Sequence, residues 1–161
     1  MLICAKSLRE LSLGRLMRLY EEDNLKRGKR EWPHEPLPRQ LALAEADAIE
    51  DLRRFFWLPG TMQYIWQEDE RYLSALLLEP WRDGLLLTAL FTAPSDRGRG
   101  YATLLLSAVL GGQNCPVYSH IDNTNRASIR VHEKCGFVRI SDTAILLDGS
   151  ASSRMGTYRY K

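Results

Sequence analysis

A nine-residue turn between an apolar strand and an apolar helix constrains this chain more than any other segment. The turn spans residues 94–102 and reads Pro-Ser-Asp-Arg-Gly-Arg-Gly-Tyr-Ala. An unbroken apolar run over 85–91 precedes it, and a run with helical spacing over 101–110 follows it. The first turn of a helix leaves backbone N–H groups unpaired, and the helix dipole attracts anions there. Because glycines let an anion approach the main chain, the segment predicts a phosphate-binding site, to which Arg97 and Arg99 add positive charge.

The pattern of apolar residues around this turn predicts a mixed α/β chain. Period-two strands are expected over 2–5, 61–67, 71–79, 85–93, 116–121, 137–147 and 155–161, and helices over 7–20, 39–57, 99–111 and 125–134. Ser7 and Glu10 form a capping box for the first helix, and residues 21–38 are expected to be an irregular, proline-containing loop. The resulting order, β-α-α-β-β-β-α-β-α-β-β, predicts an α/β (α+β) fold. A mixed central sheet of about seven strands would carry helices on both faces.

Length and composition exclude several classes of protein. The 161 residues suit a single domain over 1–161, and a net charge of +2 does not favour nucleic acid. No stretch approaches the ~20 apolar residues of a membrane span, so no membrane partner is expected. The three cysteines match no metal or redox spacing, which predicts no metal site and a reducing, cytoplasmic location.

Three kinds of phosphate-binding turn compete for this segment. The P-loop needs Gly-Lys-Ser or Gly-Lys-Thr, and neither occurs in the chain. The dinucleotide fingerprint Gly-x-Gly-x-x-Gly has Thr103 at its third glycine, although Asp122 follows at a distance suited to a ribose. The hairpin-linked strands before the turn also disfavour this NAD-binding alternative. The third pattern, Arg/Gln-x-x-Gly-x-Gly/Ala, is complete from Arg97 to Ala102.

This third pattern resembles the acyl-CoA-binding motif of the GNAT superfamily of N-acetyltransferases. A second segment, Asn125-Arg-Ala-Ser128 followed by His132-Glu-Lys134-Cys-Gly-Phe, is similar to the later Asn-x-x-Ser/Ala…Tyr-x-Lys-x-Gly-Phe motif of that superfamily. The resemblance is specific over 85–137 and rests on element order alone before residue 85. It implies the GNAT (acyl-CoA N-acyltransferase) fold and transfer of an acetyl group from acetyl-CoA to a primary amine by direct attack.

The resemblance also implies where coenzyme A would lie. Its pyrophosphate would rest on the backbone of the turn, and its pantetheine arm would pair with the end of the preceding strand. The cofactor-binding residues implied in this way are Phe91, Thr92, Ala93, Arg97, Gly98, Arg99, Gly100, Tyr101, Ala102, Asn125, Ser128 and Lys134. The strands 85–93 and 116–121 would separate to leave a slot for the thioester.

Two histidines are the catalytic candidates. An attacking amine must lose a proton, and His120 lies on the strand beside the slot, with Glu79 as a weaker second base. The departing thiolate takes a proton from a tyrosine in the superfamily, and His132 occupies that position here. Its place near a helix C-terminus favours the imidazolium. Each histidine also has a structural interpretation, His120 as a hydrogen-bonded strand residue and His132 as a support for the next strand.

The acceptor is expected to be a small-molecule amine or a peptide that enters over the first two helices. The proline-containing loop 28–38 is a candidate lid. Candidate wall residues are Tyr20, Trp32, Tyr64, Trp66 and Trp81, with Glu21 or Glu22 to attract a cation, although a place in the core is preferred for Tyr64 and Trp66. Two other functions stay open: an acyl-CoA-binding module without turnover, and an NAD-binding enzyme. A homodimer through the last strands is compatible with the pattern.

Overall fold

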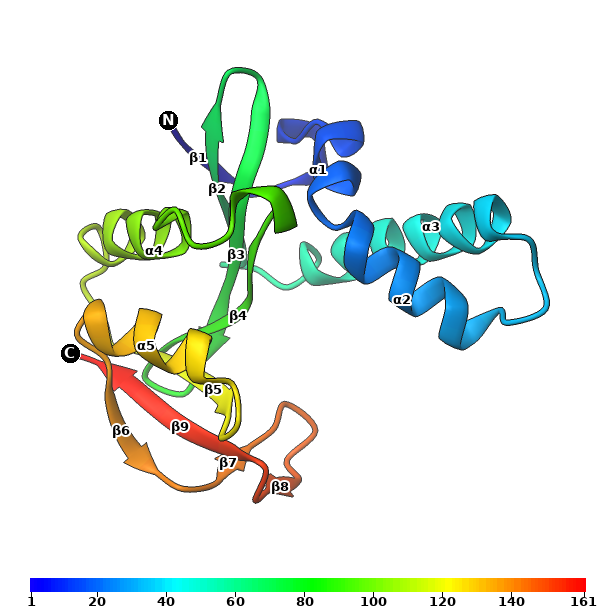
Figure 1. The fold of residues 1–161 in the computed structure, drawn as a ribbon. Coiled ribbons are helices and arrows are strands. Elements are labelled where there is room, and N and C mark those ends of the chain that lie inside the picture. Colours follow the sequence, from blue (N-terminus) through cyan, green and yellow to red (C-terminus); the bar gives the residue numbers. More distant parts are fainter.

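A central sheet of seven strands runs through the molecule, with helices on both of its faces (Figure 1). The computed structural model describes all residues from Met1 to Lys161. The strands of the sheet are β1 (Leu2–Ala5), β2 (Met62–Glu68), β3 (Arg71–Trp81), β4 (Gly84–Thr92), β5 (Val117–Asp122), β6 (Val138–Ser141) and β9 (Met155–Tyr160). They lie in the order β1-β2-β3-β4-β5-β9-β6, and only β4 and β5 are parallel. The predicted mixed α/β architecture is confirmed.

Each face of the sheet buries its own apolar cluster. The helices are α1 (Leu13–Leu19), α2 (Glu21–Glu31), α3 (Leu37–Phe55), α4 (Tyr101–Leu110) and α5 (Arg126–Lys134). On one face, leucines of α4 such as Leu105 and Leu106 pack on Leu76 and Leu78 of β3. On the other face, Leu16 and Leu19 of α1 and Leu52 of α3 pack on Ile65 and Ala75. Tyr64 is buried in the first cluster and Trp66 packs against it, which confirms the core interpretation of both residues.

The segment before β2 differs from the prediction in two places. The expected helix over 7–20 is divided into a 3-10 turn, η1 (Leu8–Glu10), and α1. The Ser7 hydroxyl donates a hydrogen bond to Oε1 of Glu10 over 2.9 Å instead of accepting one from a backbone N–H group, so no capping box forms.

Residues 21–31, expected to be irregular, form helix α2. Acidic residues fill its first turn and Lys29 and Arg30 its last turn, which complements the helix dipole, and no proline occurs before Pro33. A Cβ at Gly28 would come within 2.6 Å of the carbonyl oxygen of Gln40, so α2 packs closely on α3. The two helices form an arm that projects from the sheet (Figure 1).

The chain after α5 also differs from the prediction. The strand expected over 137–147 is divided into β6 and the short β7 (Ala144–Ile145), and β7 pairs with β8 (Ala151–Ser152) as a separate hairpin (Figure 1). Backbone bonds from Leu146 N to Ser150 O and from Gly149 N to Leu146 O close the turn of this hairpin. The irregular loop expected over 148–153 is therefore largely ordered by pairing with the end of the preceding segment.

The middle of the sheet opens between β4 and β5. Their parallel pairing covers Leu85–Val117, Leu86–Tyr118 and Leu87–Ser119 and then ends. In β4 one extra residue follows this point, because Leu77 of β3 pairs with Thr88 whereas Ala75 pairs with Phe91. Ala89 in this bulge has a φ of +52°. Since a bulge bends its strand, β4 turns away from β5 and creates the predicted slot.

Candidate active site

The turn after β4 exposes a row of unpaired backbone donors. None of the six N–H groups from Gly98 to Thr103 has a hydrogen-bond partner within the protein. Gly98 and Gly100 have φ values of +77° and +86°, which L side chains rarely adopt, and the space beside both Cα atoms is empty. A run of free N–H groups at the start of α4 fits a phosphate group, as the sequence predicts.

A cavity of about 870 Å³ begins at this turn and continues between α4 and α5. The residues implied as cofactor-binding that line it are Phe91, Thr92, Arg97, Gly98, Gly100, Tyr101, Ala102, Asn125, Ser128 and Lys134. Two others do not line it. Ala93 is buried, and its N–H group donates to the carbonyl of Leu73. Arg99 points toward Asp96.

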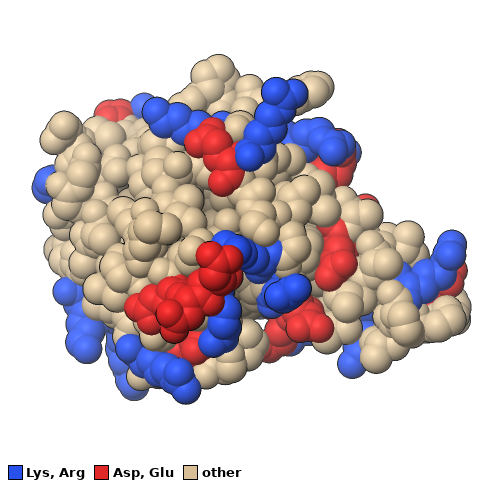
Figure 2. Space-filling view, turned by 90° about the horizontal axis from the view of Figure 1, so that it is seen from above, with Lys and Arg blue, Asp and Glu red and all other residues tan.

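Both arginines of the turn already have carboxylate partners. Arg97 lies 3.0 Å from Glu22 of α2, and Arg99 lies 3.3 Å from Asp96. Asp96, which is 2% exposed, also pairs with Arg71 of β3 over 2.7 Å. Figure 2 shows acidic and basic side chains next to one another on the face that it draws. The free main-chain N–H groups are therefore the unpaired donors of this turn. Asp96, which the sequence analysis missed, holds the turn through its ion pairs with Arg71 and Arg99.

Helix α5 forms the opposite wall of the cavity. Its N-cap is Asn125, whose side chain accepts a hydrogen bond from the N–H group of Ser128 over 3.1 Å. The structural role considered for Asn125 is thus confirmed, and its side chain also faces the cavity. Ala127, Arg130 and Val131 line the cavity as well, at helical spacing with Lys134. Because residues three and four apart lie on one face of a helix, their spacing from Lys134 could have identified these residues from the sequence.

A second cavity, of about 590 Å³, continues from the first into the slot between β4 and β5. Leu90 and Ser128 line both cavities, so the two cavities adjoin each other between β4 and α5. Both catalytic candidates, His120 and His132, line this inner cavity. Its outer wall consists of Leu146, Leu147, Asp148 and Met155, which the sequence analysis did not place at the site.

His132 is 1% exposed and carries one hydrogen bond of normal length. Its Nδ1 atom lies 2.8 Å from the carbonyl oxygen of Ser128. Because a carbonyl can only accept, Nδ1 holds the proton, and the unpartnered Nε2 atom presents a lone pair. Burial lowers the pKa of His132. The helix C-terminus was expected to favour the imidazolium, but the loss of hydration outweighs the hydrogen bond to the carbonyl of Ser128, so the ring is neutral near pH 7.

His120 extends from β5, and its ring meets the edge of Trp81 at a centroid distance of 5.2 Å. Its Nε2 atom is buried without a partner, and burial together with the charge of Arg82 lowers the pKa of the ring. Glu79, the second base considered, is 8% exposed and has no ion-pair partner, and burial raises its pKa. Glu79 does not line the inner cavity, which leaves His120 as the base candidate nearer to the slot.

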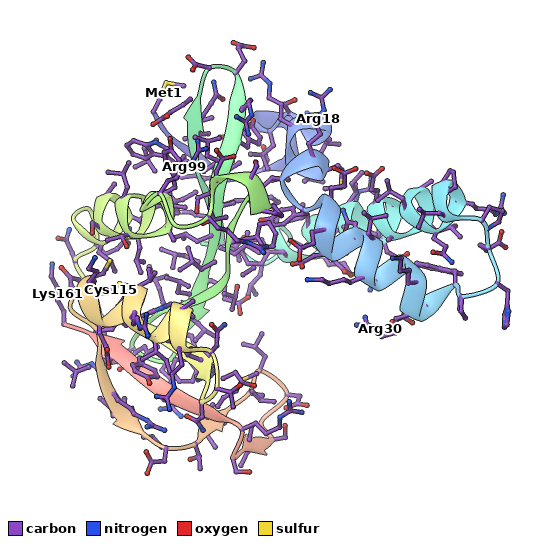
Figure 3. All side chains as sticks on the ribbon, in the orientation of Figure 1. Met1, Arg18, Arg30, Arg99, Cys115 and Lys161 are labelled. Carbon is purple, nitrogen blue, oxygen red and sulfur yellow. The ribbon has the colours of Figure 1, made fainter.

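The acceptor residues expected from the sequence lie elsewhere. The loop after α2 is at the end of the projecting arm, and none of residues 28–38 lines either cavity (Figure 1). Figure 3 shows this separation, with Arg30 in the last turn of α2 well apart from Arg99 at the phosphate-binding turn. Tyr20, Trp32 and Trp81 do not line the cavities either. Glu21 and Glu22 line a third cavity beside Arg15, Arg18 and Arg71.

Two further structural findings concern partners and metals. No group of three or more His, Cys, Asp or Glu side chains is arranged so that it could hold a metal ion. None of the helices combines the length and apolar character needed to cross a membrane. Asp122, the residue considered for a ribose, caps the turn before α5 by accepting from the N–H and hydroxyl groups of Thr124. It lines neither cavity, so the geometry gives the NAD-binding alternative no support.

Comparison with solved structures identifies the fold class. An acetyltransferase from Thermus thermophilus superposes with a TM-score of 0.69 and 16% identity, covering 99% of this chain and 96% of its own. The PaiA N-acetyltransferase of Thermoplasma acidophilum, solved in complex with coenzyme A, has a TM-score of 0.63 and 11% identity and covers 100% and 99%. A ribosomal-protein-alanine N-acetyltransferase from Brucella melitensis has a TM-score of 0.61 and 16% identity and covers 99% and 98%. At these identities the likeness shows an acyltransferase fold.

Sequence comparison then gives the family. Residues 15–137 match the Acetyltransferase (GNAT) family. No curated protein is similar enough to match the chain. The match covers most of the 161 residues, including the phosphate-binding turn and helix α5, and the chain belongs to the GNAT acetyltransferase family.

Proposed function

We propose that this protein transfers an acetyl group from acetyl-CoA to the primary amine of a small molecule or peptide. The observation that carries the proposal is the position of the six unpaired N–H groups. They lie at one end of a cavity that adjoins a second cavity, and the second cavity is lined by two histidines whose Nε2 atoms are buried and unpartnered. A pyrophosphate on the turn would direct the rest of the coenzyme along β4 toward these nitrogens. The homodimer expected through the last strands stays a prediction.

In this proposal the protein positions two substrates, and the acceptor nitrogen loses two protons. Because a free alkylammonium group has a pKa of about 10, the acceptor first gives one proton to solvent and becomes the neutral amine. The amine nitrogen attacks the carbonyl carbon of the thioester, so an N–C bond forms while the C–S bond breaks. The proton of the amine passes to the Nε2 atom of His120, which is neutral because its pKa is lowered. The sulfur can leave as a thiolate, because thiols ionise with pKa values of about 8.5.

His132 has a different task in this scheme. Its Nε2 atom can accept a hydrogen bond from the amine, but in the neutral tautomer it has no proton to give. We therefore assign it to orienting the amine N–H group, with the fixed Nδ1–H bond to Ser128 holding the ring plane. Holding two reactants in line supplies much of the barrier reduction in such bimolecular reactions.

The test combines binding and turnover on the full chain. Calorimetry with acetyl-CoA and with NAD is expected to show affinity for acetyl-CoA alone. Thiol release in the presence of a panel of primary amines, with mass spectrometry of the products, is expected to show an amine carrying one acetyl group. Absence of acetyl-CoA binding would contradict the proposal at its first step.

One observation favours a second candidate, a module that binds acyl-CoA without turnover. The position held by a tyrosine acid in the superfamily holds a histidine that presents a lone pair. Tight acetyl-CoA binding with no thiol release from any amine of the panel would select this second function over the first.

A further inference from the structure

We propose that the acceptor is a primary monoamine with an apolar body, and that Leu147 on the β7–β8 hairpin sets this specificity. The inference rests on the proposed acetyl transfer and concerns the inner cavity alone. Three features of this cavity support it: the leucines in its lining, the absence of lysine and arginine from that lining, and the exposure of Leu147.

Leucines from two segments line the inner cavity. They are Leu86, Leu87 and Leu90 of β4 and Leu146 and Leu147 of the hairpin, and the polar lining residues are Thr88, Ser119, Ser128, Asp148 and the two histidines. A hydrocarbon body against these leucines would be removed from water, which is favourable in proportion to the apolar area buried. A polar body beside the leucines would lose hydration without gaining partners there.

The charges at this cavity favour some classes of amine over others. No lysine or arginine lines it, so a carboxylate or phosphate on the acceptor would find no positive partner. Asp148 is the one carboxylate in its lining, and its Oδ1 atom already accepts from the N–H group and the hydroxyl of Ser150. The additional ammonium groups of a polyamine would have Asp148 as their one carboxylate partner and would otherwise lie beside leucines. His120 and His132 both line the cavity and both have an unpartnered Nε2 atom, so one amine group there has hydrogen-bond acceptors available.

Leu147 has no structural role that explains its side chain. It is 66% exposed, although it lies in a cavity wall, and it belongs to neither buried cluster of the protein. The two strands of the hairpin that carries it pair only with each other, and the hydrogen bonds to the rest of the protein lie at its base, from the Thr157 hydroxyl to the carbonyl of Thr143 and from Asn123 to the carbonyls of Ser153 and Arg154. An apolar acceptor would cover Leu147 and complete the wall.

The experiment measures steady-state kinetics by thiol release with four acceptors. Two are apolar monoamines, 2-phenylethylamine and hexylamine, and two carry further charges, spermidine and lysine. The wild type is expected to give kcat/KM values at least tenfold higher for the apolar pair. Leu147→Asp is expected to raise the KM for 2-phenylethylamine about tenfold, to lower the preference over spermidine, and to leave the KM for acetyl-CoA unchanged.

Leu37→Asp is the matched control, because Leu37 is similarly exposed at 51% but begins α3 at the far end of the arm. It is expected to behave as the wild type with all four amines. Preferential turnover of spermidine or lysine by the wild type would overturn the inference while leaving acetyl transfer intact. Equal effects of Leu147→Asp and Leu37→Asp on the KM for 2-phenylethylamine would also overturn the inference. Binding of acetyl-CoA with no turnover of any amine would overturn the inference together with the proposed transferase function.

Discussion

The two adjoining cavities of this protein are built in opposite ways. At the proposed phosphate end the free groups are main-chain N–H donors from six consecutive residues, and the nearby arginines are already paired with acidic residues. At the acceptor end the groups are side chains from β4, β5, α5 and the β7–β8 hairpin, brought together from distant parts of the chain. Side-chain changes should therefore alter the acceptor end strongly, whereas the phosphate end should respond mainly to changes of backbone conformation.

The largest expected effect is at the acceptor end. His120→Gln is expected to lower kcat about 100-fold, because it removes the proposed proton acceptor, while the KM for acetyl-CoA changes little. Steady-state thiol release over a range of pH would measure both constants. Since the pKa of His120 is lowered, the wild-type kcat should lose activity only below about pH 6.5, and the variant should lack this acidic limb. His34→Gln, in the exposed loop of the arm, is the control. An unchanged kcat in His120→Gln would remove this residue from the mechanism.

A backbone change should have its largest effect at the phosphate end. Gly100→Val is expected to weaken acetyl-CoA binding about tenfold in calorimetry, because a β-branched residue at a φ of +86° would turn the N–H groups away from a common point. Gly149 has a similar φ of +83° in open space at the turn of the hairpin, so Gly149→Val imposes the same strain elsewhere. It should leave acetyl-CoA affinity intact and change only the KM of the acceptor. Equal loss of acetyl-CoA affinity in both variants would break the contrast between the two ends.

Removing an arginine at the proposed phosphate end should weaken acetyl-CoA binding less than the loss of a positive charge suggests. Arg97→Gln is expected to weaken acetyl-CoA binding only about threefold at low salt, because Glu22 already offsets the charge of Arg97 over 3.0 Å. Calorimetry at two salt concentrations would measure the effect. A loss as large as that of Gly100→Val would mean that guanidinium groups, and not the main chain, carry the anion.

The smallest expected effect is on stability. The pKa of His132 in the folded protein is lowered from its ordinary value of about 6.5, so unfolding takes up a proton below that pH. The free energy of unfolding should be highest above pH 6.5 and fall on acidification, by at most about 1.4 kcal/mol per pH unit for one group. Urea titrations at several pH values should show a shallower fall in His132→Gln than in the wild type. Parallel curves would show that burial does not keep this ring neutral.

Sequence reasoning succeeded where a short segment contains its own structural cause. The strand, the glycine-containing turn and helix α4 follow one another directly, and Asn125 caps α5 three residues before its hydrogen-bond donor Ser128. Sequence reasoning failed where the structure of a segment depends on contacts with another part of the chain. Helix α2 carries few apolar residues and is stabilised by packing against α3, and β7 is defined by its pairing with β8. The neutral state of His132 likewise depends on burial, which its position in the sequence does not give.

The sequence by itself determined the glycine-containing turn, the mixed sheet and the family, because unpaired donors, glycine conformations and apolar periodicity are local properties. Only the tertiary structure decided which residues surround the gap between β4 and β5. The separation of β4 from β5, the two cavities that adjoin at Leu90 and Ser128, and the leucines of the hairpin each require segments far apart in the chain to meet. Contacts of this kind depend on how helices and strands pack against one another, and they cannot be predicted from the sequence of one segment.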